Sequence, residues 1–320
     1  MAISNSLNSG VNGMKAFSKS LEVIGDNISN VNTTGFKGSR VTNQDNFSQT
    51  FRDSSAAAAP LGGTNAMQVG SGSSVAAISQ QFTQGVLNTT GGPTDLGISG
   101  KGFLKVQNPA TSEFFYTRAG DFKLDDVGNL VTNNGFKVIG FPASATFTAT
   151  TTEGAIRISP FATLTGTPLA ATAPIASPTA PTGTAPNLIP TSGALKSYKI
   201  EKDGQIFGYY EGAKTSVLLG QILMTGFSNP NALQRSGDNL LSNGTLTTGA
   251  NGGPAGATGA TATIPNSSFG DIIQGTLELS NVDLTEQFSD LIVAQRSFQA
   301  NSRIVTVSDS ILEEVVNLKR

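Results

Sequence analysis

Two motifs in the central sequence contain residue types that could bind a phosphate or a metal ion. Residues 97–103 (GISGKGF) supply the glycines and the lysine of a phosphate-binding loop. Such a loop has Ser or Thr directly after the lysine and a helix behind it, whereas Gly102 follows Lys101 and a strand is expected next. The pattern therefore disfavours phosphate binding at these residues.

The second motif is an acidic cluster formed by Asp121, Asp125 and Asp126. Catalytic carboxylates usually face each other as a pair across a cleft, and calcium loops space their ligands two residues apart around a glycine. The sequence DFKLDDVGNL matches neither arrangement. Residues 126–129 (DVGN) are instead typical of a hairpin turn, which favours Asp, Gly and Asn.

The aromatic run Phe114, Phe115 and Tyr116 has two interpretations. It could stack against sugar rings, or it could be one strand with alternate rings in the core and the others at an interface. The second interpretation is the more common one for such a run, and we adopt it.

Two residue types are missing from the chain, and their absence restricts its chemistry. Without His and Cys there is no Ser-His-Asp triad, no thiol nucleophile, no disulfide and no zinc site with nitrogen or sulfur ligands. Carboxylate catalysis and oxygen-ligand calcium or magnesium sites remain open. We assign no catalytic, cofactor-binding or metal-binding residue, and we expect no cofactor and no enzymatic activity.

Composition indicates a chain of strands and turns that does not bind nucleic acid. Only 13% of the 320 residues are charged, and 37 are glycine. The net charge of -2 leaves no basic face to replace the counterions of phosphates. The first 17 residues lack the charged start and apolar core of a secretory signal, and no apolar window is long enough to span a membrane.

The N-terminal segment is predicted to be a helix. Alternate steps of four and three residues give a seam of apolar residues interrupted once, at Gly10: Ile3, Leu7, Gly10, Met14, Phe17, Leu21, Ile24, Ile28 and Val31. Turn and C-cap residues between Asn30 and Gly35 end the helix.

The C-terminal segment is predicted to be a second helix that opens near Asn281 or Asp283. Asp283 or Thr285 is the expected N-cap, with Glu286 in the first turn. Its heptad seam comprises Leu291, Phe298, Val305 and Leu312, extended by Leu284, Phe288 and Val316, with Gln295, Ser302 and Asp309 interrupting the second position. The two helices predict a shared antiparallel coiled coil, and the alternative is that each packs separately on the central domain.

The sequence between the helices alternates in hydrophobicity and carries hairpin-turn signals, so we expect strands there. The predicted fold class is α+β, with paired terminal helices and a mainly-β central domain. The expected organisation is a helical domain (1–35 and 281–320), an extended connector (36–74 and 264–280), a β-rich core (75–142 and 193–263) and a Thr/Ala/Pro-rich insertion or minimal outer β subdomain (143–192).

Long stretches of the chain resemble the flagellar rod and hook family. Residues 21–40 (LEVIGDNISNVNTTGFKGSR) are similar to its N-terminal signature, and residues 277–320 to the C-terminal one. Residues 102–131 and 226–233 match as well, so the resemblance covers well over half the chain. The matching motif residues are Asn27, Asn30, Asn32, Gly35 and Phe36, with Asn281 and Gln295 at the other end.

Within the family, SNVDLTEQF (280–288), ILEEVVNLKR (311–320) and GFPA (140–143) resemble the hook protein. The resemblance implies a structural subunit that joins copies of itself in a helical tube and transmits torque from rod to filament. A distal-rod subunit of the basal body is the alternative, and a secreted carbohydrate-active enzyme or adhesin is a remote one.

The resemblance also implies partners and a location. The expected partners are the distal rod protein, the hook cap, the hook–filament junction proteins and the flagellar type III export apparatus. The chain would leave the cell without signal cleavage and reside in the extracellular flagellum, at the hook and basal body. The expected subunit-interface residues are Leu7, Met14, Phe17, Leu21, Ile24, Ile28, Phe288, Leu291, Phe298, Val305 and Leu312.

Overall fold

The computed structural model describes residues 2–56, 62–142, 153–158, 194–211, 216–227, 229–242, 262–263 and 270–318. The chain forms two units. The helical unit comprises Met1–Val31, Lys37–Phe82 and Val282–Arg320, and the β unit comprises Asn32–Phe36 and Thr83–Asn281.

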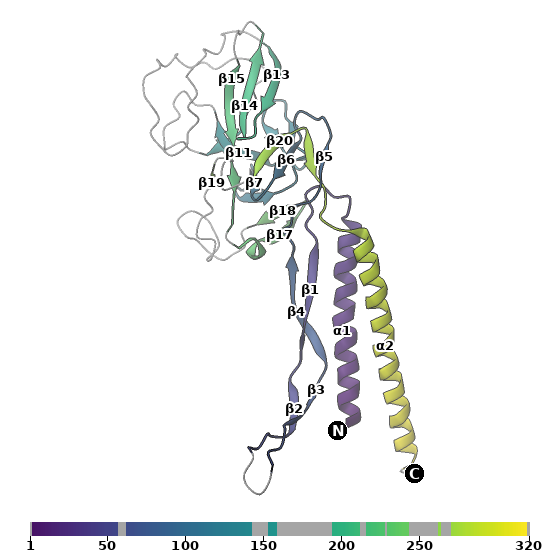
Figure 1. Cartoon of the computed structure of the whole chain (residues 1–320). Coiled ribbons are helices and arrows are strands. Elements are labelled where there is room, and N and C mark those ends of the chain that lie inside the picture. Colours follow the sequence, from purple (N-terminus) through teal and green to yellow (C-terminus); the bar gives the residue numbers. More distant parts are fainter. Residues whose placement is uncertain are drawn as a thin grey trace. The chain divides into compact units, whose positions relative to one another are not determined.

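The helical unit is built on two long antiparallel helices, α1 (Ala2–Ser29) and α2 (Leu284–Asn317), which run side by side (Figure 1). Asp283 caps α2 as expected, because its Oδ1 accepts hydrogen bonds from the backbone N–H groups of Thr285 (2.8 Å) and Glu286 (3.4 Å). The first-turn carboxylate of Glu286 also lies at the favourable end of the helix dipole.

A two-stranded ribbon accompanies α1 in the same unit. It consists of the antiparallel pairs β1 (Ser39–Asp45) with β4 (Ser73–Gln80) and β2 (Ser48–Arg52) with β3 (Met67–Gly70). The side-chain amide of Asn12 on α1 donates to the carbonyl of Ser71 (3.1 Å), so this helix packs on the ribbon as well as on α2.

The β unit contains all the remaining strands. In chain order they are β5 (Leu87–Thr89), β6 (Leu96–Ser99), β7 (Phe103–Gln107), β8 (Phe114–Thr117), β9 (Lys123–Leu124), β10 (Leu130–Val131), β11 (Lys137–Pro142), β12 (Gly154–Ala155), β13 (Leu195–Ile200), β14 (Gln205–Tyr210), β15 (Val217–Ile222), β16 (Met224–Thr225), β17 (Gln234–Gly237), β18 (Leu240–Ser242), β19 (Ala262–Thr263), β20 (Asp271–Gln274) and β21 (Thr276–Glu278), with a 3-10 turn at Pro230–Ala232.

The main sheet of the β unit follows the order β13-β14-β15-β11-β7-β8-β18-β17, and all its pairings are antiparallel. Two smaller pairs, β20 with β6 and β21 with β5, bring the last strands of the unit beside its first. The core is mostly aliphatic and almost fully closed to solvent, and it includes Leu96, Leu104, Ile206, Ile222 and Met224.

The predicted fold class is confirmed: the terminal helices pair, and the central region is mainly β. Residues 39–45, 48–52 and 67–70, within the segment expected as a connector, are strands of the ribbon, and residues 270–278 of the other connector belong to the β unit. The expected insertion at 143–192 lies outside the described residues except for 153–158.

Candidate functional site

The surface between α1 and α2 combines small and polar residues with aliphatic ones. A Cβ atom on Gly13 would lie 2.9 Å from Nδ2 of Asn301, and one on Gly10 would lie 3.1 Å from Cγ2 of Val305. Near the helix ends, the hydroxyls of Ser6 and Ser308 approach to 3.4 Å. These contacts fix an antiparallel register in which the glycines of α1 let α2 approach closely.

Asn27 fixes the other end of the helix pair and is almost fully buried, with 3% of its surface exposed. Its Nδ2 donates to Oε1 of Gln287 on α2 (2.9 Å) and to the carbonyl of Ser39 at the start of β1 (2.8 Å), while its Oδ1 accepts from the Ser39 N–H (2.9 Å). One side chain thus ties both helices and the ribbon. Because a buried amide is costly when unpaired, these bonds select this register.

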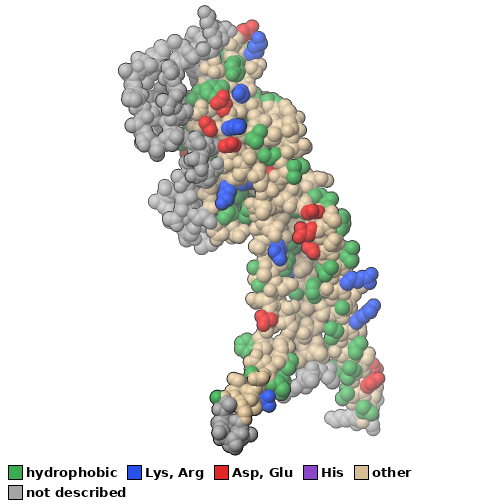
Figure 2. All heavy atoms as spheres, viewed as in Figure 1, with side chains coloured by type: hydrophobic (Ala, Val, Ile, Leu, Met, Phe, Trp, Pro, Cys, Tyr) green, Lys and Arg blue, Asp and Glu red, His purple; other side chains and the backbone are tan. Residues whose placement is uncertain are grey.

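Large apolar side chains remain exposed on α2 and on the ribbon. On α2 they include Phe288 (51% exposed), Ile292 (57%), Val307 (58%) and Val316 (65%), and Phe47, between β1 and β2, is 93% exposed. None of the large apolar side chains that are exposed in the described residues lies on α1. Figure 2 shows such side chains scattered along the helical unit. Apolar side chains that lie exposed together mark a surface that binds another protein, and α2 carries more of them than any other element described.

The sequence-predicted interface residues therefore divide into two groups. Leu7, Met14, Phe17, Leu21 and Ile28 are half-buried and Ile24 is buried, and on α2 Leu291 and Val305 are half-buried. Phe288, Phe298 and Leu312 are exposed. Contact of these residues with neighbouring subunits stays a prediction.

Sequence reasoning missed the small residues of the seam. The side chains of α2 that lie against α1 include Ala294, Asn301 and Ser308, each one residue before the polar positions noted as interruptions. Their heptad spacing was the available signal. It was overlooked because a search for apolar residues passes over Gly, Ala, Ser and Asn.

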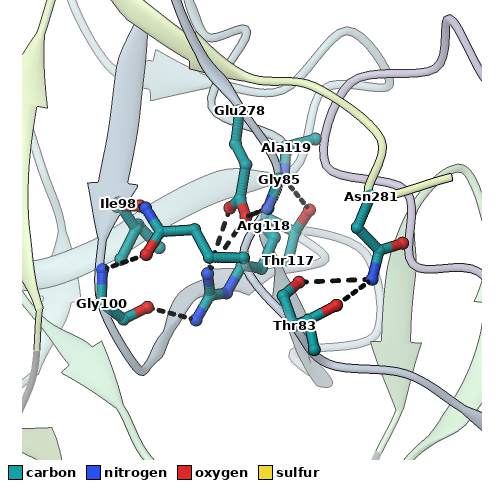
Figure 3. A network of polar contacts seen from close by, with 10 residues as sticks. Thr83, Gly85, Ile98, Gly100, Thr117, Arg118, Ala119, Glu278 and Asn281 are labelled. Atoms are coloured by element: carbon teal, nitrogen blue, oxygen red, sulfur yellow. Dashed lines mark hydrogen bonds and ion pairs between the residues drawn. The ribbon is translucent and has the colours of Figure 1, made fainter. Parts of the chain in front are cut away.

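A buried ion pair organises the β unit. Arg118 and Glu278 have side chains only 6% and 0% exposed, and the Arg118 Nη1 atom lies 3.1 Å from Oε2 of Glu278. The other carboxylate oxygen accepts from the Gly85 N–H (2.9 Å), and Arg118 Nη2 donates to the carbonyl of Gly100 (2.7 Å). Figure 3 shows that this one pair joins strand β21, the loop before β5 and the loop after β6.

The family-motif residues of the β unit surround the same place. Gly35 donates from its N–H to the Glu278 carbonyl (2.7 Å) at a φ of 68°, and a Cβ there would lie 2.5 Å from the Ala119 nitrogen. Asn281 donates to Thr83 Oγ1 (2.8 Å; Figure 3). The segments where the chain enters and leaves the unit are thus bonded to one another.

The other motif residues have separate positions. The buried ring of Phe36 lies under the Arg235 guanidinium, whose Cζ is 4.5 Å from the ring centroid. Asn30 donates to the carbonyl of Asp26 (3.0 Å) at the end of α1. Asn32 and Gln295 are exposed.

None of the motifs examined for chemistry forms a reactive site. Gly100 and Gly102, with φ of 119° and 130°, sit in a loop that joins β6 to β7, so no helix follows the lysine. The rings of Phe115 and Phe136 stack with centroids 5.5 Å apart, and the Tyr116 ring, 4% exposed, packs inside the unit, as the strand interpretation requires.

The acidic motif forms a turn. The Asp125 carboxylate accepts from the N–H groups of Val127 (2.9 Å) and Asn129 (2.8 Å) and from the Asn129 side chain (2.7 Å). Desolvation of Asp125 raises its pKa, but these hydrogen bonds outweigh that effect and hold the pKa below its usual value. The described residues contain no cluster of three acidic side chains that could hold a metal ion.

Neither a ligand site nor a membrane span is evident in the part of the chain that the structure describes. A hollow of about 190 Å³ is lined by Asp121, Asp238, Thr132 and neighbouring polar residues, without a base placed beside a nucleophile. Neither α1 nor α2 is apolar enough over its length to cross a lipid bilayer.

Three family models match the chain. "Flagella basal body rod protein" matches residues 7–37, "Flagellar hook protein FlgE/F/G D1 domain" matches 97–208, and "Flagellar basal body rod FlgEFG protein C-terminal" matches 273–318. The first covers most of α1 and the turn that follows it, the third covers β21 and α2, and the second lies within the β unit.

Curated relatives match over nearly the whole chain. The flagellar basal-body rod protein FlgG of Bacillus subtilis is 39% identical over 319 residues, covering 98% of this chain and 99% of the relative. FlgG of Borreliella burgdorferi is 31% identical over 315 residues, covering 96% of each. The hook protein FlgE of Treponema pallidum is 28% identical over an alignment of 475 residues, covering 98% of this chain and 99% of the relative.

The matched family is structural. The paired terminal helices, the exposed apolar surface of α2 and the full-length similarity lead to one assignment. The chain belongs to the flagellar rod and hook family and is a structural subunit of the flagellar axis, not an enzyme.

Proposed function

We propose that this chain is the subunit of the flagellar hook, and that copies of it polymerise into the flexible tube that transmits torque from rod to filament. The observation that carries polymerisation is the apolar surface that the chain leaves uncovered on α2 and on the ribbon. At about 25 cal/mol per Å² of apolar area removed from water, covering several such side chains stabilises a polymer contact considerably.

The hook assignment rests on the residues that resemble the hook protein. The segment GFPA ends β11 and leads into the part of the chain that returns as β13, β14 and β15 at one edge of the main sheet. The sequence from Ile158 to Leu195 contains no charged residue and many small ones, a composition that would permit shallow, adjustable contacts between neighbours as the hook bends. Export through the flagellar type III apparatus without signal cleavage, and contacts with the distal rod, hook cap and junction proteins, belong to the same proposal.

A distal-rod subunit is the second candidate. The similarity to the Bacillus subtilis rod protein favours it, because the two align over nearly the full length of both chains in 319 residues. The hook relatives need alignments of 430 to 475 residues, so they carry segments that this chain lacks.

Electron microscopy of a deletion strain separates the candidates. The hook assignment predicts a complete rod without hook or filament, and curved tubes from the purified protein. A rod that stops short would favour the distal-rod assignment. Intact flagella in the deletion strain would refute both.

Point variants test the assembly surface itself. Leu21→Asp and Leu291→Asp place a carboxylate at half-buried positions of the helix pair, and we expect both to abolish polymerisation while the β unit stays folded. Ser18→Asp, at an exposed position of α1, is the matched control and should still polymerise. Tubes formed by Leu21→Asp or Leu291→Asp would show that the helix seam is not required.

A further inference from the structure

The last segment of the β unit, residues 270–281, crosses the unit as an extended chain. It contains β20 and β21, which are separated by Gly275 at a φ of 75°. β20 pairs with β6 and β21 pairs with β5, and neither strand belongs to the main sheet. We call this segment the closing strap. Because β5 and β6 come early in the unit, the closing strap links the beginning of the unit to its end.

Hydrogen bonds tie the closing strap to parts of the β unit that are distant in sequence. The Ile272 N–H donates to the carbonyl of Lys202 (3.0 Å). The side-chain amide of Gln274 accepts from the Ile200 N–H (2.9 Å) and donates to the carbonyl of Pro93 (2.6 Å). A β unit without the closing strap would leave these backbone groups without the partners that they have here.

The closing strap also pairs with strands that lie far from it in sequence. Glu278 lies opposite Leu87, 191 residues earlier, whereas the widest described pairing of the main sheet, between Tyr116 and Leu241, spans 125 residues. Contacts between distant residues form late in folding, because the entropy of closing a long loop is lost before such contacts contribute free energy. The topology therefore favours closure of the strap after formation of the main sheet.

The charge on the closing strap is a second reason for late closure. The Glu278 carboxylate lies 3.1 Å from Nη1 of Arg118, and both side chains are almost fully closed to solvent (Figure 3). The Nε atom of Arg118 has no hydrogen-bond partner among the described residues. Ile272 is the member of the buried core cluster that the strap supplies. Closure therefore removes water from two charges, and this costs more free energy than the burial of one isoleucine side chain contributes.

We propose that closure of this strap is the last and rate-limiting event in the folding of the β unit, and that desolvation of the Arg118–Glu278 pair makes it slow. The attraction between the two charges develops only when they meet, whereas their water is lost on the way. The finished pair also fixes the register of β21, because a shifted strand would leave the Arg118 guanidinium buried without its carboxylate. The pair thus delays folding and defines its end point.

An exported subunit benefits from this delay, and for this benefit alone the inference rests on the proposed function. Export through the type III apparatus requires a chain whose β unit is not yet complete. A chain from which residues 270–281 are not yet available keeps Arg118 without its carboxylate partner. The β unit of such a chain therefore stays open until the strap can be added.

Refolding kinetics of the full chain test the role of the pair, with tyrosine fluorescence as the signal because all four tyrosines lie in the β unit. Arg118→Met/Glu278→Leu should fold about tenfold faster, because its apolar side chains carry no charge that must lose water. Lys199→Met/Glu201→Leu is the matched control. Its ion pair (3.9 Å) is largely exposed, so its folding rate should stay within about twofold of the unmodified chain. An unchanged folding rate in Arg118→Met/Glu278→Leu would overturn the proposal.

Two isoleucine variants test the order of events without changing any charge. Ile272 on the closing strap and Ile206 on β14 are both almost completely buried, so Ile→Val removes one buried CH₂ group in each case. Ile206→Val should slow folding about two- to tenfold and leave the unfolding rate nearly unchanged, because its contacts form before the strap closes. Ile272→Val should instead speed unfolding by a similar factor, with little effect on the folding rate. The reverse assignment, or an equal division between the two rates, would overturn the proposed order.

Polymerisation is a separate readout. Refolding is measured on the unassembled chain, so its outcome does not depend on whether copies form a tube. A chain that polymerises but lacks the expected rate differences would overturn the role of the strap and leave the proposed function standing. A chain that shows these differences but does not polymerise would count against the proposed function and support the role of the strap.

Discussion

Removing the carboxylate of Glu278 should strongly destabilise the β unit. The Glu278→Ala variant leaves the Arg118 guanidinium buried with the Gly100 carbonyl as its remaining hydrogen-bond acceptor among the described residues, and the Gly85 N–H without its carboxylate acceptor. Breaking a buried pair by removing one partner costs about 3–5 kcal/mol. For a unit of this size that loss lowers the melting temperature by about 6–20 °C.

Tyrosine fluorescence during urea unfolding reports on this unit selectively, since all four tyrosines lie in it and the chain has no tryptophan. Glu201→Ala is the matched control, because its pair with Lys199 (3.9 Å) is largely exposed and such pairs contribute about 0–1 kcal/mol. Arg118→Met/Glu278→Leu should recover most of the lost stability by replacing the charges with apolar groups. A cost below about 1 kcal/mol for Glu278→Ala would refute the role given to the pair.

Three further predictions concern the helix pair and the tyrosines. Gly13→Leu should lower the helix content of the chain in far-ultraviolet circular dichroism, because the new side chain would displace Asn301. Gly25→Leu is the control and should not, because a Cβ there meets no neighbouring element within 4 Å. Equal spectra of the two variants would contradict the close approach of the helices at Gly13. Asn27→Ala should speed amide exchange at Ser39, whose N–H loses its acceptor, and unchanged exchange there would contradict the bond. Burial raises the pKa of three tyrosines, so their protonated side chains contribute to the stability of the folded β unit. This contribution is present below about pH 10 and is lost as the pH rises through their folded-state pKa values. Absorbance at 295 nm should then show that Tyr116, Tyr198 and Tyr210 ionise as the β unit unfolds. Full ionisation of these three residues near pH 10 in a folded unit would contradict the prediction.

The terminal helices were predictable because their signals are local. Heptad spacing located both, and the sequence Asn-Val-Asp-Leu-Thr-Glu contains the N-cap that the structure places at Asp283. The closeness of the helices was not predictable in the same way. It depends on Gly10 and Gly13 meeting Val305 and Asn301, a match between small residues almost 300 positions apart.

The buried ion pair could not have been found from sequence. Arg118 and Glu278 are separated by 160 residues, and each sits in a segment whose local pattern predicts only a strand or a turn. The ribbon was similarly hidden: residues 39–52 are mostly polar and exposed, so they show no alternation of buried and exposed apolar residues. Its pairing arises from backbone hydrogen bonds between strands that both flank α1.

The hydrogen bond between Asn281 and Thr83 places the two ends of the long segment of the β unit side by side. Its long segment begins at Thr83 and ends at Asn281, and the Nδ2 atom of Asn281 lies 2.8 Å from Oγ1 of Thr83, so the two ends of this segment are neighbours in space. Adjacent ends are the property that lets a domain be circularised, permuted or inserted into a loop of another protein. A host loop could therefore receive residues 83–281 without a long linker, and residues 32–36, which include the buried Phe36, would have to be supplied with them.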